Sequence, residues 1–245
     1  MDLTINAEVA GWRVISDLAV EFAGHSYVVT KGGILGRMKV YDPAVYRIAD
    51  YTALPVSSFI PKLLYSGEYA GDLVSVLEFH SSAVSLMSLG PVQEPAALRI
   101  LYKLSVLMTS LHDVGLYHGG LHPDSVYWDG ENAYLYDFGS AIGATVMRRQ
   151  TLAPSDFLDI PETGADPVDF MRADVSRLAG LLYYLIYGES PGTIKKAAAF
   201  KPSGSLALDT LFSRAFCWLP SDRLNIISFR YYLDRTLADY GISMP

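Results

Sequence analysis

The spacing of hydrophobic positions divides the chain into two parts of different character. Between residues 12 and 79, short apolar runs rich in β-branched and aromatic residues alternate with glycine-containing breaks, at 27–29, 37–40, 62–65 and 73–79. Runs of this kind are typical of antiparallel strands joined by turns. Residues 44–54, which lie between two prolines, are expected to form a short helix.

From about residue 80 onward the apolar spacing becomes helical. Glu94 and Pro95 open a segment that runs through His112, and leucines recur in it at every third or fourth position. That period places them on one buried face of a helix. Residues 174–187, 205–217 and 225–240 show the same spacing, whereas 116–142 again favours strand and loop. The pattern predicts an α+β protein with a β-rich part, residues 1–80, and a helical part, residues 81–245.

Composition narrows the possible partners and the location of the protein. Hydrophobic residues make up 51% of the 245 positions and charged residues 18%, which favours a packed core over disorder. A net charge of −7 gives no global positive field, so nucleic acid is not an expected partner. The longest apolar block, 178–187, is about half of the roughly 20 residues that a bilayer span needs. Cys217 is the single cysteine, so no intrachain disulfide can form, and we expect a cytoplasmic protein without a membrane span.

Residues 115–142 carry the motif that narrows the fold. They read GLYHGGLHPDSVYWDGENAYLYDFGSAI. The segment resembles the catalytic loop, hairpin and metal loop of protein kinases, in which H-R-D-x-K-P-x-N is followed by D-F-G. His118, Leu121 and Pro123 match this pattern, and Asp137-Phe138-Gly139 follows at the expected distance.

Further landmarks of the protein-kinase family occur in order along residues 12–237. Lys39 resembles the strand lysine that holds the α- and β-phosphates of ATP, and Glu78 with Phe79 and His80 resembles the hinge. Asp174 resembles the helix aspartate that bonds the catalytic-loop backbone. Residues 160–162 and 219–223 resemble the A-P-E and D-P-x-x-R motifs, which implies an ion pair between Glu162 and Arg223. The resemblance implies a bilobal protein-kinase-like fold, with a small β-rich N lobe and a larger helical C lobe.

Within this resemblance, several positions that phosphoryl transfer needs carry other residues. Catalysis by kinases depends on a catalytic-loop aspartate that accepts the proton of the attacking hydroxyl. Gly120 occupies that position, and Gly119 replaces the arginine before it. Ser125 replaces the asparagine that holds a second Mg²⁺, and His122 replaces the loop lysine. The resemblance therefore assigns no catalytic base to this chain.

The loop and the helix that would position a nucleotide are also altered. Aligning residues 18–27 with the glycine-rich loop puts Ala19 and Glu21 at the first two glycines, and only Gly24 remains. Gly32 and Gly33 are the competing phosphate-loop candidate. No glutamate lies between Lys39 and Glu68, so Asp50 is the only substitute for the glutamate that pairs with the kinase lysine. Such a lysine would be unpaired and free to swing away from the phosphates.

A reduced set of nucleotide-binding residues remains. Lys39, Glu78, His80 and Asp137 are the predicted cofactor-binding residues, and Asp137 is the predicted Mg²⁺ ligand. Together they predict binding of ATP with Mg²⁺ that is weak or absent. The competing interpretation is structural, in which Asp137 caps backbone groups in a glycine turn and Lys39 points to solvent.

The sequence therefore favours a pseudokinase, a catalytically inactive domain that serves as scaffold, allosteric regulator or decoy. The expected partner is a protein, such as a kinase, a kinase substrate or another regulatory protein. One alternative is an atypical ATP-dependent kinase or nucleotidyl transferase that uses Lys39 and Asp137, with Asp124 as a displaced base. Another is a relative of small-molecule phosphotransferases, suggested by the H-G-x-L-H-P run. Thr145 and Thr151, beside Arg148 and Arg149, suggest a phosphosite, although Gly119 removes the arginine that would receive the phosphate.

Overall fold

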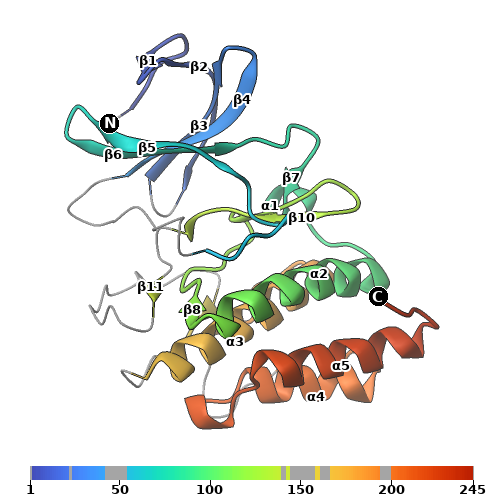
Figure 1. The fold of residues 1–245 in the computed structure, drawn as a ribbon. Coiled ribbons are helices and arrows are strands. Elements are labelled where there is room, and N and C mark those ends of the chain that lie inside the picture. The colour runs from blue at the N-terminus through green and yellow to red at the C-terminus, as the bar shows by residue number, and fades with distance from the viewer. Residues whose placement is uncertain are drawn as a thin grey trace.

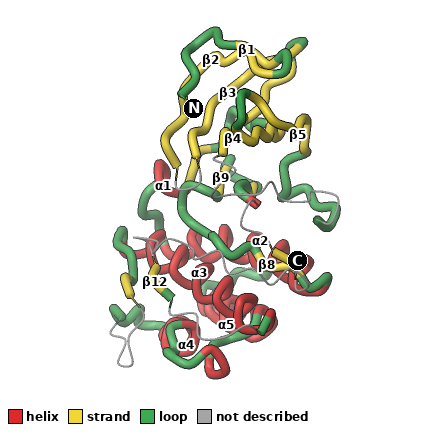
Figure 2. Tube along the Cα trace, turned by 90° about the vertical axis from the view of Figure 1, so that its left-hand side faces the viewer, coloured by secondary structure: helices red, strands yellow, loops and turns green. Residues whose placement is uncertain are grey.

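The computed structural model describes residues 2–21, 24–41, 54–138, 142–143, 158–160, 166–193 and 200–244. A β-sheet lies at one end of the molecule and a group of helices at the other, as Figure 1 shows. Figure 2, turned by 90°, shows the same division. The chain passes from the sheet to the helices after residue 78, close to the position at which the hydrophobic spacing changes.

The larger sheet has six antiparallel strands in the order β1-β2-β3-β4-β6-β5. Their bounds are Glu8–Val9 (β1), Trp12–Glu21 (β2), Gly24–Lys31 (β3), Ile34–Tyr41 (β4), Leu63–Tyr69 (β5) and Asp72–Glu78 (β6). A two-residue turn joins β3 to β4, and Gly32 and Gly33 adopt the positive φ angles of 57° and 82° that such turns require. The strands predicted around residues 27–29, 37–40, 62–65 and 73–79 are confirmed.

Strand β4 has two faces with different surroundings, because successive side chains of a strand point to opposite sides. Met38 and Val40 are buried in the apolar core of the large sheet, with residues such as Tyr27, Val74 and Val76. Arg37 and Lys39 lie on the opposite face and are also buried, at 2% and 4% exposure. Two cations are therefore buried side by side on one strand.

The helical part is built around α2, Glu94–Asp113, which packs against α3 and α5. The predicted apolar face is confirmed, because the leucines of its three-to-four spacing are at most 1% exposed: Leu98, Leu101, Leu104, Leu107 and Leu111. The other helices are α1 (Leu86–Leu89), α3 (Pro167–Tyr187), α4 (Leu206–Ala215) and α5 (Ile226–Asp239), with a 3-10 turn at Pro220–Asp222. Side chains of Asp166, Ser205 and Asn225 cap the N-termini of α3, α4 and α5.

Short strands lie before α1, between α2 and α3, and after α3. They are β7 (Val84–Ser85), β8 (Leu116–Tyr117), β9 (Val126–Trp128), β10 (Ala133–Leu135), β11 (Ile142–Gly143) and β12 (Leu158–Asp159), and β13 (Gly192–Thr193) follows α3. Strands β9 and β10 form the predicted hairpin, and the Asp129 carboxylate accepts hydrogen bonds from the Glu131 and Asn132 amides in its turn. The helix predicted at residues 44–54 falls almost wholly outside the described residues. Within the described part of the chain, no helix is both long and apolar enough to span a membrane.

Candidate functional site

The loop between β8 and β9 is held by a buried carboxylate of α3. Asp174 is fully buried, and its two oxygens accept the backbone N–H groups of His118 at 2.6 Å and Gly119 at 2.8 Å. Burial opposes ionisation of Asp174, but the contact with His112 and the nearby cations hold its pKa below the usual range. The predicted bond between Asp174 and the loop backbone is thus confirmed.

His118 lies beneath this loop and has a structural role. Its ring is fully buried, and Nδ1 accepts the Gly120 backbone N–H at 3.2 Å. Nε2 therefore carries the proton, which it donates to the Tyr136 carbonyl at 3.1 Å. Burial lowers the pKa of His118, in accord with a neutral ring. The centroids of the His118 ring and the buried Phe138 ring lie 5.2 Å apart in a T-shaped arrangement. This contact joins the loop to the segment after β10.

The position predicted for the catalytic base lies in the loop that Asp174 and His118 hold. Gly120 has no side chain, and its N–H is used by His118. The preceding residue, Gly119, has a φ angle of 74°, a conformation that side-chain-bearing residues adopt only at a cost. The loop is therefore formed and anchored without a proton acceptor at this position.

Ser125 turns its hydroxyl into the loop. The hydroxyl donates to the His122 carbonyl at 2.8 Å and accepts the His122 N–H at 3.1 Å. Its side chain is also buried, since Ser125 is only 3% exposed. In this geometry the Ser125 hydroxyl closes the loop. It is not directed outward as a ligand for the second Mg²⁺ that the kinase asparagine holds.

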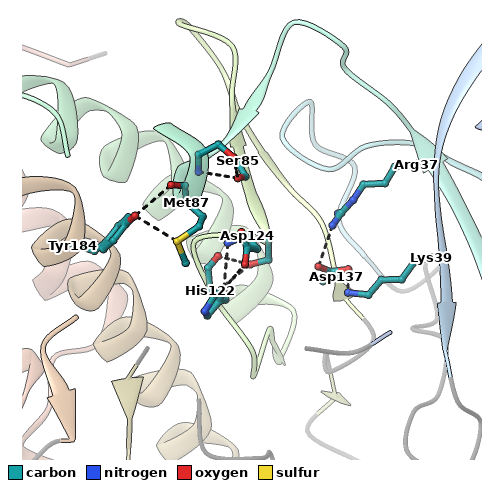
Figure 3. Close-up of polar contacts among 10 residues, drawn as sticks. Arg37, Lys39, Ser85, Met87, His122, Asp124, Asp137 and Tyr184 are labelled. Carbon is teal, nitrogen blue, oxygen red and sulfur yellow. Dashed lines mark hydrogen bonds and ion pairs between the residues drawn. The ribbon is translucent and has the colours of Figure 1, made fainter. Parts of the chain in front are cut away.

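Asp124 and His122 face each other on the outer side of the loop. The Asp124 N–H donates to His122 Nδ1 at 3.2 Å, and the Asp124 carboxylate lies 3.4 Å from the same nitrogen. Figure 3 shows this pair apart from Asp137 and Lys39. Helix α1 is bonded to this loop, because the Pro123 carbonyl accepts the Met87 N–H at 3.3 Å. This arrangement does not favour Asp124 as a displaced base.

Asp137, two residues after the end of β10, contacts both cations of strand β4. Lys39 Nζ donates to Asp137 Oδ1 at 2.7 Å, and an Arg37 guanidinium nitrogen lies 3.5 Å from Oδ2. Figure 3 shows the three side chains converging from two segments. Burial opposes ionisation of Asp137, but Lys39 and Arg37 outweigh it and hold its pKa far below the usual range. The expectation of an unpaired or solvent-facing lysine is wrong, because Lys39 has a carboxylate partner on another segment.

Arg37 also contacts two tyrosine rings of the β9–β10 hairpin. Its Cζ atom lies 5.1 Å from the ring centroid of Tyr127 and 4.6 Å from that of Tyr136. A guanidinium over an aromatic face is attracted by the negative potential of the ring, most strongly where water is excluded. We call Arg37, Lys39, Tyr127, Tyr136 and Asp137 the interlobe cluster. Sequence reasoning missed Arg37, Tyr127 and Tyr136, although the strand period already placed Arg37 on the same face as Lys39.

The predicted hinge is joined to the same hairpin. The Tyr136 hydroxyl donates to the Glu78 backbone carbonyl at 3.1 Å, and burial raises the pKa of that tyrosine. The His80 ring stacks on Tyr134 with a centroid distance of 3.8 Å. The predicted cofactor-binding residues are thus brought to one region, and each of the four contacts a group of the protein itself.

The glycine-rich-loop alignment coincides with the β2–β3 hairpin. Glu21 pairs with Gly24 at its end, and neighbouring His25 pairs with Val40 beside Lys39. Gly32 and Gly33 instead form the turn at the opposite end of β3. A Cβ atom on Gly24 would lie 2.0 Å from the Val40 carbonyl oxygen, so strand packing alone requires this glycine. The competing phosphate-loop candidate, Gly32 and Gly33, thus lies at the end of β4 that is farther from Lys39.

Several predicted residues lie outside the described part of the chain. These are Asp50, Gly139, Glu162 and the candidate phosphosite with its arginines, residues 145–151. The expected partner of Glu162 is described, and Arg223 donates from Nε to the Cys217 carbonyl and from a terminal nitrogen to the Trp218 carbonyl, both at 2.9 Å. Arg223 therefore holds the backbone that leads into the 3-10 turn.

The donor set does not fit Mg²⁺ in this arrangement. Mg²⁺ requires near-octahedral oxygen ligands, of which the protein supplies one or two carboxylates. Each oxygen of Asp137 faces a cation, and the Ser125 hydroxyl is bonded within its loop. Among the described residues, no group of three or more histidine, cysteine, aspartate or glutamate side chains is placed to hold a metal ion.

Comparison with solved structures identifies the architecture. The crystal structure of the Mycobacterium tuberculosis PknI kinase domain matches 98% of this chain and 100% of its own, with a TM-score of 0.72 and 21% sequence identity. The chain has a protein-kinase-like fold. The predicted α+β class, with a small β-rich N lobe and a larger helical C lobe, is confirmed, and β2-β3-β4-β6-β5 form the kinase-like N-lobe sheet with β1 added at its edge.

Curated sequences point to the same protein-kinase-like superfamily. Serine/threonine-protein kinase pkn2 of Myxococcus xanthus is 27% identical over 165 residues, and serine/threonine-protein kinase greatwall of Canis lupus familiaris is 28% identical over 178 residues. The alignments cover 62% and 66% of this kinase-like chain, but only 18% and 20% of the relatives. No family model matches the chain. The predicted resemblance to protein kinases is confirmed.

Proposed function

We propose that this protein-kinase-like domain is catalytically inactive and acts by binding a protein partner, as a scaffold, allosteric regulator or decoy. The observation that carries the proposal is Gly120, which occupies the position of the catalytic base in a loop that Asp174 anchors. An intact loop without a proton acceptor preserves the architecture but removes one chemical step that kinases require. Partners of the proposed classes are a kinase, a kinase substrate or another regulatory protein.

The surroundings of Gly120 support the same proposal. The Ser125 hydroxyl is used inside the loop, and both oxygens of Asp137 are occupied by protein cations. Binding of ATP with Mg²⁺, for which Lys39, Glu78, His80 and Asp137 are the proposed residues, is accordingly weak or absent. A cytoplasmic location is part of the proposal, and the single cysteine, which excludes an intrachain disulfide, supports it.

The second candidate function is an atypical kinase or nucleotidyl transferase. The observation that favours it is the retained pair of Lys39 and Asp137, whose charged atoms lie 2.7 Å apart. This function requires that the pair open and accept a nucleotide with its metal ion. It further requires a base other than Gly120.

Transfer of labelled phosphate separates the two functions. Wild type is incubated with γ-labelled ATP and Mg²⁺ or Mn²⁺, with generic protein substrates and alone, and in parallel with α-labelled ATP. The inactive domain transfers neither label, and Gly120→Asp alone does not restore transfer because Ser125 and the glycine loop remain altered. Saturable transfer by wild type that Asp137→Asn abolishes, with the variant shown to be folded, would contradict the proposed function and favour the second candidate.

A further inference from the structure

The groups expected to receive a nucleotide are engaged by side chains of the protein. Lys39 bonds Asp137, the Glu78 carbonyl accepts from the Tyr136 hydroxyl, and His80 stacks on Tyr134. A missing catalytic base explains none of these contacts, because a domain without phosphotransferase activity can still bind nucleotide. The contacts therefore call for an explanation beyond the proposed function.

Arg37 links these contacts physically. It leaves the N-lobe strand β4, ends against the rings of Tyr127 and Tyr136, and places a guanidinium nitrogen 3.5 Å from Asp137. A guanidinium is planar, stacks on aromatic faces and carries a permanent positive charge. It thus supplies two things at once, a flat group against the rings of the hairpin and a countercharge for the aspartate.

The residue is also well suited to join two lobes. Arg37 is 2% exposed, and its partners come from β9 and from the two residues that follow β10. Attraction between the guanidinium and the rings is strongest in such a water-excluded setting. Tyr136 adds a second link, because the ring that contacts Arg37 also bonds the hinge carbonyl through its hydroxyl.

We propose that Arg37 is an internal occupant of the nucleotide site, which clamps the N lobe to the C lobe and closes that site to ATP. A nucleotide would have to displace the guanidinium from Tyr127 and Tyr136, free the Glu78 carbonyl and separate Lys39 from Asp137. The relative position of the lobes is then fixed by the chain itself and does not depend on nucleotide.

The first test measures nucleotide binding by wild type. The melting temperature is recorded with ATP and with ADP, each with and without Mg²⁺. A ligand present at a hundred times its Kd would raise the melting temperature of a chain of this length by roughly 5–10 °C. We expect no saturable shift at millimolar nucleotide. A saturable shift in wild type overturns the inference.

The second test measures the clamp by hydrogen exchange of Arg37→Ala and Tyr136→Phe. Tyr136→Phe keeps the ring and removes only the hydroxyl that donates to the Glu78 carbonyl. This variant tests the clamp if Arg37→Ala does not fold. Arg13→Ala is the matched control, since Arg13 is exposed on β2. For both cluster variants we expect amide hydrogen exchange to become about tenfold faster in residues 76–80, 126–128 and 133–136. The control variant should exchange at the wild-type rate in these segments. Unchanged exchange at these segments in the folded variants overturns the inference.

The two proposals fail separately. Nucleotide binding by wild type without phosphate transfer overturns the closed site and leaves the catalytically inactive domain standing. Saturable phosphate transfer by wild type overturns both.

Discussion

Lys39 and Asp137 are 98 positions apart in the chain, and their Nζ and Oδ1 atoms lie 2.7 Å apart. The pair connects strand β4 of the N lobe with the segment after β10. Arg37 approaches the other oxygen of the same carboxylate, so one carboxylate faces two cations of one strand. Through these two contacts Asp137 has a structural role in the interlobe cluster.

Removing the charge of Asp137 should destabilise the protein strongly. Asp137→Asn keeps the size of the side chain but removes the carboxylate charge that the buried Lys39 and Arg37 face. Breaking one member of a buried ion pair costs about 3–5 kcal/mol in the free energy of unfolding. Urea unfolding at neutral pH measures the change, with Asp234→Asn, an exposed position of α5, as control. A loss below about 1 kcal/mol would show that the three charges are not coupled.

Asp174 should prove as important for the catalytic loop. Asp174→Asn retains one acceptor, whereas the backbone N–H groups of His118 and Gly119 require two. Hydrogen bonds to a buried charged group are each worth about 1.5–3 kcal/mol, so we expect a loss of about 2–3 kcal/mol. Urea unfolding measures the loss, and hydrogen exchange at residues 118 and 119 locates it. Equal protection of both amides in variant and wild type would contradict the role assigned to Asp174.

His25 should make part of the stability depend on pH. It lies between the carboxylates of Asp2 at 3.1 Å and Asp17 at 2.8 Å. Burial lowers the pKa of His25, but hydrogen bonds and charge from Asp17 and Asp2 outweigh it, so the net pKa is raised. A raised pKa means that the protonated ring stabilises the folded state. This contribution is complete below the unfolded pKa of about 6.5 and is lost as pH rises through the folded pKa.

The measurement compares wild type with His25→Gln at about pH 5.5 and about pH 8.5, on either side of the histidine range. We expect the difference in melting temperature to be larger at the lower pH. The effect amounts to at most about 1 kcal/mol, because both aspartates are exposed to solvent. A difference that grows with pH would have the wrong sign for this arrangement.

Gly24 should be intolerant of a side chain for a reason unrelated to nucleotide. A Cβ atom there would meet the Val40 carbonyl oxygen at 2.0 Å, so Gly24→Ala must move β3 away from β4. We expect a loss of about 2–3 kcal/mol, as for other overpacked sites. Gly33→Ala is the control, because its φ is also positive but no atom lies within 4 Å of the added carbon. It should cost about 1 kcal/mol, and equal losses for the two variants would contradict the packing argument.

The helices and the catalytic-loop register follow from local signals. The apolar face of α2 repeats every three or four residues, and such a repeat specifies both the element and its buried side without knowledge of the rest of the chain. His118, Pro123 and Asp137 lie at spacings that the kinase-like resemblance fixes, and the structure places the loop, the hairpin and Asp174 accordingly. For the same reason, the sequence could place Gly120 at the position expected for the catalytic base.

The partners of Lys39 and the role of Arg37 could not be predicted from local sequence signals. The alternation of β4 places both cations on one face, but nothing in that strand says which segment covers the face. Charges from distant segments pair only when the fold excludes water around them, and that exclusion depends on how the two lobes pack. The sequence alone therefore determined the kinase-like architecture and placed a glycine, Gly120, at the position expected for the catalytic base. Only the tertiary structure decided that Arg37 meets Tyr127, Tyr136 and Asp137, because burial creates these interactions and burial is a property of the whole fold.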